Sequence, residues 1–220
     1  MNMMLRQIYV TKIKQYVPKS VFLVYNVLKE RFHIKFPESA LAHRYLDGMK
    51  GLEIGGSTHN PFGLNTKNVD YTAETNQYKK LEEKFVGQAL PVDIVAPGDN
   101  IPLPDESQDF IVSAHVIEHF PDPIKALKEW YRLVRPGGYI FMIVPHKERT
   151  FDKDEPRTTL QELIDRHEGK MTVRPNKNDH SSVWVTEDMV TLVRHLGWNI
   201  VEVQEKDDKV GNGFTIVIQK

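Results

Sequence analysis

The amino-acid sequence predicts an α/β fold built on a mostly parallel sheet of seven strands that ends in an antiparallel hairpin. From residue 51 onward, short apolar runs alternate with amphipathic helical stretches, an order that favours right-handed crossovers between parallel strands. In the clearest helix, 123–134, Ile124, Leu127, Trp130 and Val134 recur on one face. The five strands expected in this alternating part are 51–54, 68–71, 92–95, 109–114 and 139–144.

Two further strands, 198–204 and 214–219, close the chain. The turn between them contains glycine and asparagine, so we expect the two strands to pair antiparallel. A helix over 187–196 precedes them, with Thr186 as its expected N-cap and Gly197 just past its end. The sheet is therefore expected to be parallel except at this edge.

The stretch 146–185 interrupts the alternation between the fifth strand and the last helix. It is polar, with one short helix expected near 159–167. Binding groups commonly sit on loops that a rigid scaffold carries, so we interpret this stretch as a substrate-recognition insert. Residues 1–48 read as helices separated by Pro18 and form an expected N-terminal cap on the main domain, 49–220.

Composition narrows the classes of protein. The net charge of −1 gives the whole chain no strong attraction to nucleic acid, and the absence of cysteine excludes disulfides, thiolate metal sites and a cysteine nucleophile. No apolar run reaches the roughly 20 residues that span a bilayer, and no signal peptide is recognisable, so we expect a cytoplasmic protein.

The first 50 residues carry nine Lys and Arg against three acids. This basic region is either a helical lid packed on the domain or a face that contacts anionic lipid. We favour the packed cap, because the aromatic side chains of the region would otherwise be exposed. The sequence leaves the oligomeric state open.

A ligand in an open α/β sheet binds beyond the carboxyl ends of the strands. Gly55 and Gly56 follow the first strand, where they permit a sharp turn and a close approach of the backbone to a ligand. Asp70 ends the second strand, where a carboxylate can accept hydrogen bonds from both ribose hydroxyls. NAD enzymes share this carboxylate, but the G-x-G-x-x-G pattern of their pyrophosphate site is absent, because Ser57 and Asn60 occupy its later positions.

The segments 101–123 and 133–140 carry a more specific pattern. A strand ending in Ser113-Ala114 is followed by His115-Val-Ile-Glu-His119, then a helix, then the turn Arg135-Pro-Gly-Gly138 into the next strand. In this order of segments, the chain resembles the class I methyltransferases that use S-adenosylmethionine. The resemblance covers about residues 50–145, and residues 186–220 fit the usual C-terminal part of the family. The resemblance implies a Rossmann-like fold, S-adenosylmethionine as cofactor and S-adenosylhomocysteine as product.

The resemblance also implies a set of cofactor contacts. An acid at the end of the first strand holds the amino-acid end of the cofactor, the ribose meets an acid after the second strand, and an acid near the third strand meets adenine beside an apolar side chain. The corresponding residues here are Glu53, Gly55, Gly56, Ser57, Asp70, Tyr71, Asp93, Ile94 and His115. Ser57 stands where the family usually has another glycine.

A hydroxyl acceptor gains from a general base, usually a histidine or a carboxylate. The candidates near the expected position of the methyl group are His146, His180 with its neighbour Asp179, and His115, of which His115 is expected to line the cofactor. His119 is interpreted as a structural hydrogen-bonding group. We expect no metal, because the H-x-x-x-H spacing of His115 and His119 spans the turn after the fourth strand and does not lie on one element, and no H-x-D spacing occurs.

The lead hypothesis is a methyltransferase for oxygen or nitrogen of a small polar acceptor. The segment 145–153 resembles bacterial methyltransferases of surface-polysaccharide assembly, which implies a sugar or nucleotide sugar. A non-catalytic relative with a degenerate cofactor loop is the alternative. The chain has no Tyr-x-x-x-Lys pair after the fourth strand, which argues against an NAD-dependent oxidoreductase. It also has no Asn-Pro-Pro-Tyr type motif after that strand and no basic charge balance, which argues against methylation of nucleic acid.

Overall fold

The computed structural model describes residues 38–56, 62–74, 79–80, 91–173 and 175–220. The predictions for Ser57 and for residues 1–37 of the N-terminal cap concern residues outside these described ranges. Within it, helix α3 (Ala40–Leu46) begins at Ser39, whose side chain accepts a hydrogen bond from the backbone N–H of Ala42.

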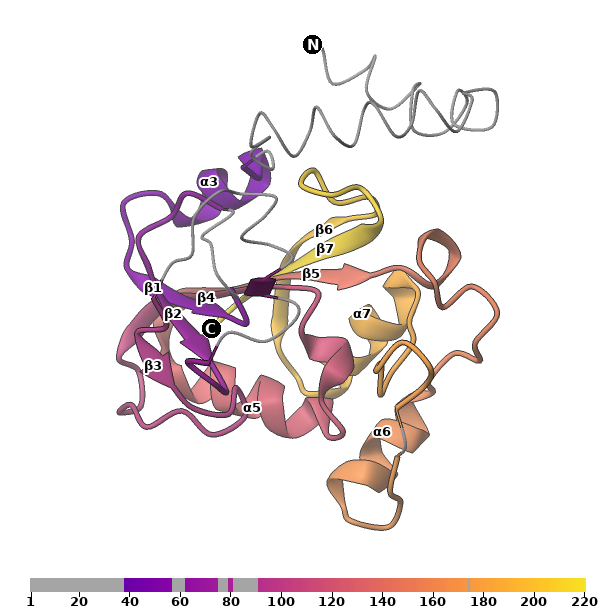
Figure 1. The fold of residues 1–220 in the computed structure, drawn as a ribbon. Helices are drawn as coiled ribbons and strands as arrows, with labels where there is room; N and C mark the ends of the chain where they lie inside the picture. Colours follow the sequence, from indigo (N-terminus) through magenta and orange to yellow (C-terminus); the bar gives the residue numbers. More distant parts are fainter. Residues whose placement is uncertain (1–37, 57–61, 75–78, 81–90, 174) are drawn as a thin grey trace.

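A seven-stranded sheet with the order β3-β2-β1-β4-β5-β7-β6 forms the centre of the molecule (Figure 1). The first five strands are parallel, and β7 runs antiparallel to both β5 and β6, which confirms the predicted hairpin at the sheet edge. The strands are β1 (Gly51–Ile54), β2 (Thr66–Asp70), β3 (Ile94–Val95), β4 (Gln108–Ala114), β5 (Val134–Pro145), β6 (Asn199–Gln204) and β7 (Gly213–Gln219).

Both faces of the sheet are covered, because successive side chains of a strand point to opposite faces. On β5, Ile140 and Met142 join the larger apolar cluster with α5 (Pro123–Leu133) and α7 (Thr186–His195). Phe141 and Ile143 join a second cluster with α3. The sheet therefore lies between α3 on one side and α5 and α7 on the other, as Figure 1 shows.

Local sequence determines where the helices begin. Helix α5 starts at Pro123, and the side chain of Asp122 accepts a hydrogen bond from the N–H of Lys125. The expected N-cap of α7 is wrong by one residue: Thr186 is its first residue, and Asp188 Oδ2 accepts from the N–H of Val185 at 3.0 Å. The hydroxyl of Thr186 instead donates to Glu205 at 2.5 Å, which removes it from the capping position.

The segment 146–185 runs alongside the sheet instead of extending it. It contains a short 3₁₀ turn, η3 (Lys147–Arg149), and helix α6 (Leu160–His167), whose capping box joins Thr159 and Glu162. A second 3₁₀ turn, η2 (Ile117–His119), follows β4. Among the described residues, no helix is both long and apolar enough to cross a bilayer.

Candidate active site

The strand order places the switch point of the sheet between β1 and β4, where an open α/β sheet typically binds its ligand. These two strands are parallel neighbours, but the chain continues outward from β1 to β2 and from β4 to β5, so their carboxyl ends mark the switch point of the sheet. Gly55 follows β1 with φ +66°, and a Cβ there would lie 2.7 Å from Cγ2 of Val116. Because only glycine combines this angle with this close approach, Gly55 and Gly56 turn directly against the segment that follows β4.

Glu53 and Asp70 stand on neighbouring strands beside this turn. Glu53 is 3% exposed, and the hydroxyl of Thr66 donates to its Oε2 at 3.5 Å. Asp70, at the end of β2, is nearly buried as well. Both acids thus lie where the resemblance places contacts to a nucleoside-containing cofactor.

Asp70 forms an ion pair with Lys79, whose Nζ lies 3.2 Å from Oδ2. The N–H of Thr72 donates to Oδ1 at 3.2 Å. An ionised carboxylate offers about four lone-pair positions, so these two partners leave acceptor capacity for two ribose hydroxyls.

Asp93 lies just before β3, whereas we expected it within a strand over 92–95. The strand begins at Ile94, and the Asp93 carboxylate accepts from the N–H of Asn68 at 2.7 Å. Asp93 therefore lies at the amino end of β3, away from the carboxyl ends of the strands. Ile94 is half-buried and packs against the main core.

The loop that does follow β3 contains Gly98, Asp99 and Asn100. It is held by Trp130, whose indole N–H donates to the Gly98 carbonyl at 2.7 Å, and by Lys125, whose Nζ lies 2.8 Å from Asp99 Oδ2. Asp99 is thus an acid near the carboxyl end of β3 that the sequence analysis missed. The signal that could have found it is its position four residues after the expected end of the third strand.

Tyr71 follows Asp70 and is 71% exposed, so its ring is accessible beside the end of β2. His115 follows β4 with φ +55°, and its N–H donates to the carbonyl of Ile143 at 3.0 Å. Burial lowers the pKa of His115 to about 4, which leaves the imidazole uncharged at neutral pH.

Glu118 lies on η2, three residues after His115, and is 1% exposed. Neither carboxylate oxygen has a hydrogen-bond partner among the described residues. Burial raises the pKa of Glu118 to about 8. Histidine nitrogens surround it at somewhat longer range: from its Oε1, His119 Nε2 lies at 3.8 Å, and His115 Nδ1 and His180 Nε2 lie at 4.0 Å.

His180 comes from the insert and is oriented by Asp152. Its Nδ1 lies 2.7 Å from Asp152 Oδ2, while Asn176 and Asn178 donate to Oδ1 of the same carboxylate at 2.9 and 3.1 Å. Burial of Asp152 raises its pKa, but the hydrogen bonds from His180 and the two asparagines outweigh burial and hold the pKa below its usual value. The insert therefore supplies an imidazole of fixed orientation.

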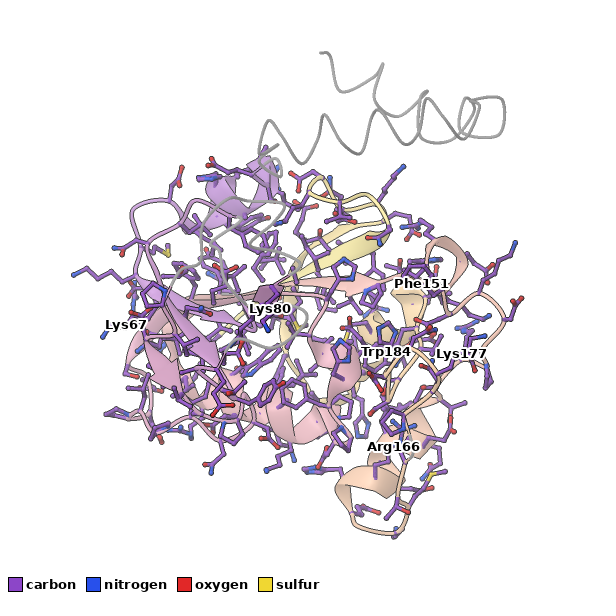
Figure 2. The ribbon with its side chains drawn as sticks, viewed as in Figure 1. Lys67, Lys80, Phe151, Arg166, Lys177 and Trp184 are labelled. Atoms are coloured by element: carbon purple, nitrogen blue, oxygen red, sulfur yellow. The ribbon has the colours of Figure 1, made fainter. Side chains whose placement is uncertain are left out.

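Backbone contacts hold the segment around His180 against η2. The N–H groups of Ser181 and Ser182 donate to the carbonyl of Glu118 at 2.7 and 3.1 Å. From α6, Arg166 donates to the carbonyl of Ser181 at 2.8 Å. Figure 2 labels Arg166 on α6 and Trp184 near α7, and these two side chains mark the region of the insert that carries His180.

The other two candidates for catalysis have different surroundings. Asp179 has an exposed side chain and φ +61°, and its carbonyl, not its carboxylate, meets Nδ1 of His119 at 2.9 Å. His146 is buried against Phe214, its Nδ1 accepts from the N–H of Glu148, and its Nε2 lies 3.5 Å from Glu205. The structure thus brings His115, His119 and His180 together around Glu118 and engages His146 elsewhere.

Comparison with known proteins agrees with this geometry. Residues 55–142 match the methyltransferase domain family, a range that runs from the glycine turn through β5. Over this part of the chain, the match supports a class I methyltransferase that depends on S-adenosylmethionine. The cofactor that the family implies is S-adenosylmethionine.

Two curated relatives illustrate the similarity of the domain. The ubiquinone/menaquinone biosynthesis C-methyltransferase UbiE of Geotalea daltonii is 31% identical over 119 residues, which cover 51% of this chain and 50% of the relative. The chloroplastic 2-methyl-6-phytyl-1,4-hydroquinone methyltransferase 1 of Oryza sativa subsp. japonica is 31% identical over 111 residues, or 47% of this chain and 33% of the relative. The chain thus spans half or less of the length of these relatives.

Solved structures show the same fold. A SAM-dependent methyltransferase from Methanosarcina mazei has a TM-score of 0.55 at 17% identity and covers 84% of this chain and 98% of its own. A SAM-dependent methyltransferase from Aquifex aeolicus has a TM-score of 0.52 at 20% identity, with 88% and 95% covered. At these identities the likeness concerns the fold, and it confirms the predicted Rossmann-like architecture.

Proposed function

We propose that the protein transfers a methyl group from S-adenosylmethionine to an oxygen or nitrogen atom of a small polar acceptor. The observation that carries this proposal is the switch point between β1 and β4, called the crevice below, where the Gly55 turn follows one strand and His115 follows the other. The region that matches the methyltransferase family is the region that builds this crevice.

The residues present fit the cofactor. Gly55 lets the backbone turn tightly against Val116 at the end of β1, Asp70 retains acceptor capacity for the ribose, and Glu53 offers a nearly buried carboxylate on β1. Asp99 and Asn100 follow β3, and we assign the adenine contact to this loop in place of Asp93. Ser57 remains a predicted contact.

S-adenosylmethionine supplies a methyl group that its sulfonium has already activated, so the protein mainly has to position the acceptor. The low pKa of His115 is useful in this setting, because a neutral imidazole adds no positive charge beside a sulfonium. The glycine turn and the half-buried Val116 restrict the room beside the crevice. The insert then contributes the polar groups that face the acceptor.

The acceptor we propose is a hydroxyl-bearing polar molecule, with a sugar or nucleotide sugar as its first candidate class. The polar surroundings of Glu118, Asp152 and His180 support a polar acceptor over a flat apolar one. The two curated relatives are named for hydroquinone and for ubiquinone or menaquinone methylation, so phenolic rings form the second class to test.

Calorimetric titration with S-adenosylmethionine, S-adenosylhomocysteine and NAD tests the cofactor. We expect micromolar binding of the first two, no binding of NAD, and at least tenfold weaker binding by Asp70→Asn. Asp154→Asn is the matched control, because Asp154 is an exposed acid of the insert. Folded protein that binds neither methyl-donor compound would overturn the proposal and favour the non-catalytic alternative.

A screen for methylated product follows on the same protein. Nucleotide sugars and phenolic acceptors are incubated separately with radiolabelled S-adenosylmethionine, and transfer of the label is counted. Labelling of a nucleotide sugar supports the first acceptor class, whereas labelling of phenols alone would replace it with the second.

A further inference from the structure

We propose that Glu118, His119 and His180 form a binding site for a divalent transition-metal ion. One ligand atom from each of these residues lies within 4.8 Å of the others. Glu118 and His119 come from η2 and His180 comes from the insert, 62 positions after Glu118, so no local sequence spacing reveals the set. This explains why the sequence analysis expected no metal.

The distances suit a site that closes slightly around an ion. His119 Nε2 and His180 Nε2 lie 3.8 and 4.0 Å from Glu118 Oε1. Ligand atoms about 2.1 Å from a four-coordinate zinc are separated by roughly 3.4 Å, so shifts of about half an ångström bring both histidine–carboxylate distances to this value. His119 is half exposed, which gives its side chain room for such a shift.

The state of Glu118 is the second observation that indicates a cation. Its side chain is 1% exposed and both carboxylate oxygens lack a hydrogen-bond partner among the described residues. A buried polar group without partners is costly, and a buried carboxylate is normally paired or bound to a metal. The histidine nitrogens that face it lie beyond hydrogen-bond distance, so they do not supply that partner.

The outer nitrogens of both histidines are already engaged. His119 Nδ1 meets the carbonyl of Asp179 at 2.9 Å, and His180 Nδ1 meets the carboxylate of Asp152 at 2.7 Å. A carbonyl or carboxylate at Nδ1 fixes the tautomer that leaves Nε2 unprotonated, and metal-binding histidines almost always have such a partner. Both rings therefore direct Nε2, the coordinating atom, toward Glu118.

The ligand set selects the class of ion. Two imidazoles and one carboxylate suit zinc, iron(II), cobalt(II) or manganese(II), whereas magnesium and calcium prefer oxygen ligands throughout. Three protein ligands leave at least one coordination position open. If the proposed methyl transfer holds, this position would accept an oxygen of the acceptor, an extension that rests on the proposed function.

Metal binding is measured on the full chain after chelator treatment, without S-adenosylmethionine. Cobalt(II) is titrated with detection of its visible absorption, and zinc is titrated calorimetrically. We expect one ion per chain for each metal, with no comparable binding of magnesium. Binding of no ion, or several weak ions without visible cobalt bands, would overturn the proposal.

Three variants and one control assign the site. Glu118→Gln, His119→Ala and His180→Ala should each weaken zinc binding at least a hundredfold, while His195→Ala, which removes an exposed histidine of α7, should leave it unchanged. His119 is the decisive position if the buried variants unfold, because its side chain is 47% exposed. Equal zinc affinity of wild type and a folded His119→Ala variant would contradict the site.

The same samples separate this site from the cofactor site. Binding of S-adenosylhomocysteine by the metal-free protein tests the crevice alone, and zinc binding without cofactor tests the Glu118 cluster alone. Loss of one with retention of the other identifies which of the two proposals has failed.

Discussion

Asp207 organises the loop between β6 and β7, and its replacement by asparagine should destabilise the protein. The side chain is 3% exposed and accepts four backbone N–H groups: Lys209 and Val210 donate to Oδ1 at 3.1 and 2.6 Å, Gly211 to both oxygens, and Gly213 to Oδ2 at 2.7 Å. Each of the two carboxylate oxygens thus accepts hydrogen bonds from at least two backbone N–H groups of the loop.

In Asp207→Asn, one of the two acceptor oxygens becomes an NH₂ donor. If Oδ1 stays on the Lys209 side, the N–H of Gly213 loses its acceptor and faces a second donor. One buried donor without a partner costs about 1–3 kcal/mol, and the surviving bonds lose the assistance of the negative charge. We therefore expect the free energy of unfolding to fall by about 2 kcal/mol, measured by urea denaturation at pH 7.

The effect should depend on pH in a defined direction. Burial raises the pKa of Asp207, but the N–H donors outweigh it and hold the pKa below its usual value. A carboxyl group with a depressed folded pKa stabilises the protein above its unfolded pKa of about 3.9 and loses that contribution as the pH falls through the folded value. The gap between wild type and variant should thus be constant from pH 7 to 5 and narrow in acid.

Asp154→Asn is the control for this measurement, because an exposed acid should change stability by less than about 0.5 kcal/mol. A difference between wild type and Asp207→Asn as small as that of the control would refute the assignment of the loop's stability to these hydrogen bonds.

Two further predictions concern the crevice and the core. Gly55→Ala should lower the free energy of unfolding by about 1–2 kcal/mol, because alanine disfavours φ +66° and its Cβ would lie 2.7 Å from Val116. The same variant should bind S-adenosylhomocysteine more weakly in calorimetry, and unchanged affinity would contradict the role of the turn. Leu127→Ala removes a fully buried side chain of α5 and should cost about 2–5 kcal/mol in urea denaturation, whereas Lys128→Ala on the same helix should cost far less.

Helices and strands with a clear hydrophobic period, or bounded by proline, glycine or turn residues, could be predicted from sequence. The β1 bounds, the helix after Asp122 and the terminal hairpin follow from local patterns, and the structure has them where the patterns indicate. The third strand is shorter than expected because only Val69 and Asp70 offer it a partner, at Ile94 and Val95. Because β3 begins only at Ile94, Asp93 precedes the strand, and our candidate for the adenine contact becomes the loop that contains Asp99.

The polar centre of the site could be predicted only in part. Spacing indicated His115 and His180 as functional candidates, but it favoured His146 equally, and His146 packs against Phe214 beside the hairpin instead. Sequence analysis assigned no role to Glu118, because a glutamate in a Glu-His pair carries no signal of its burial. In the structure its backbone carbonyl accepts from the N–H groups of Ser181 and Ser182, far along the chain, and its side chain is buried.

Local sequence was enough to predict the α/β class, the glycine turn after β1, the acid at Asp70 and the resemblance to the methyltransferases, because each rests on residues close together in the chain. Which distant side chains meet became visible only in the folded structure. Asp152 orients His180, and His180 faces Glu118, because the insert folds back against the end of β4 and hydrogen-bonds to η2. Such contacts depend on loop paths that no local propensity encodes, and they create the buried carboxylate and histidine cluster on which the metal proposal rests.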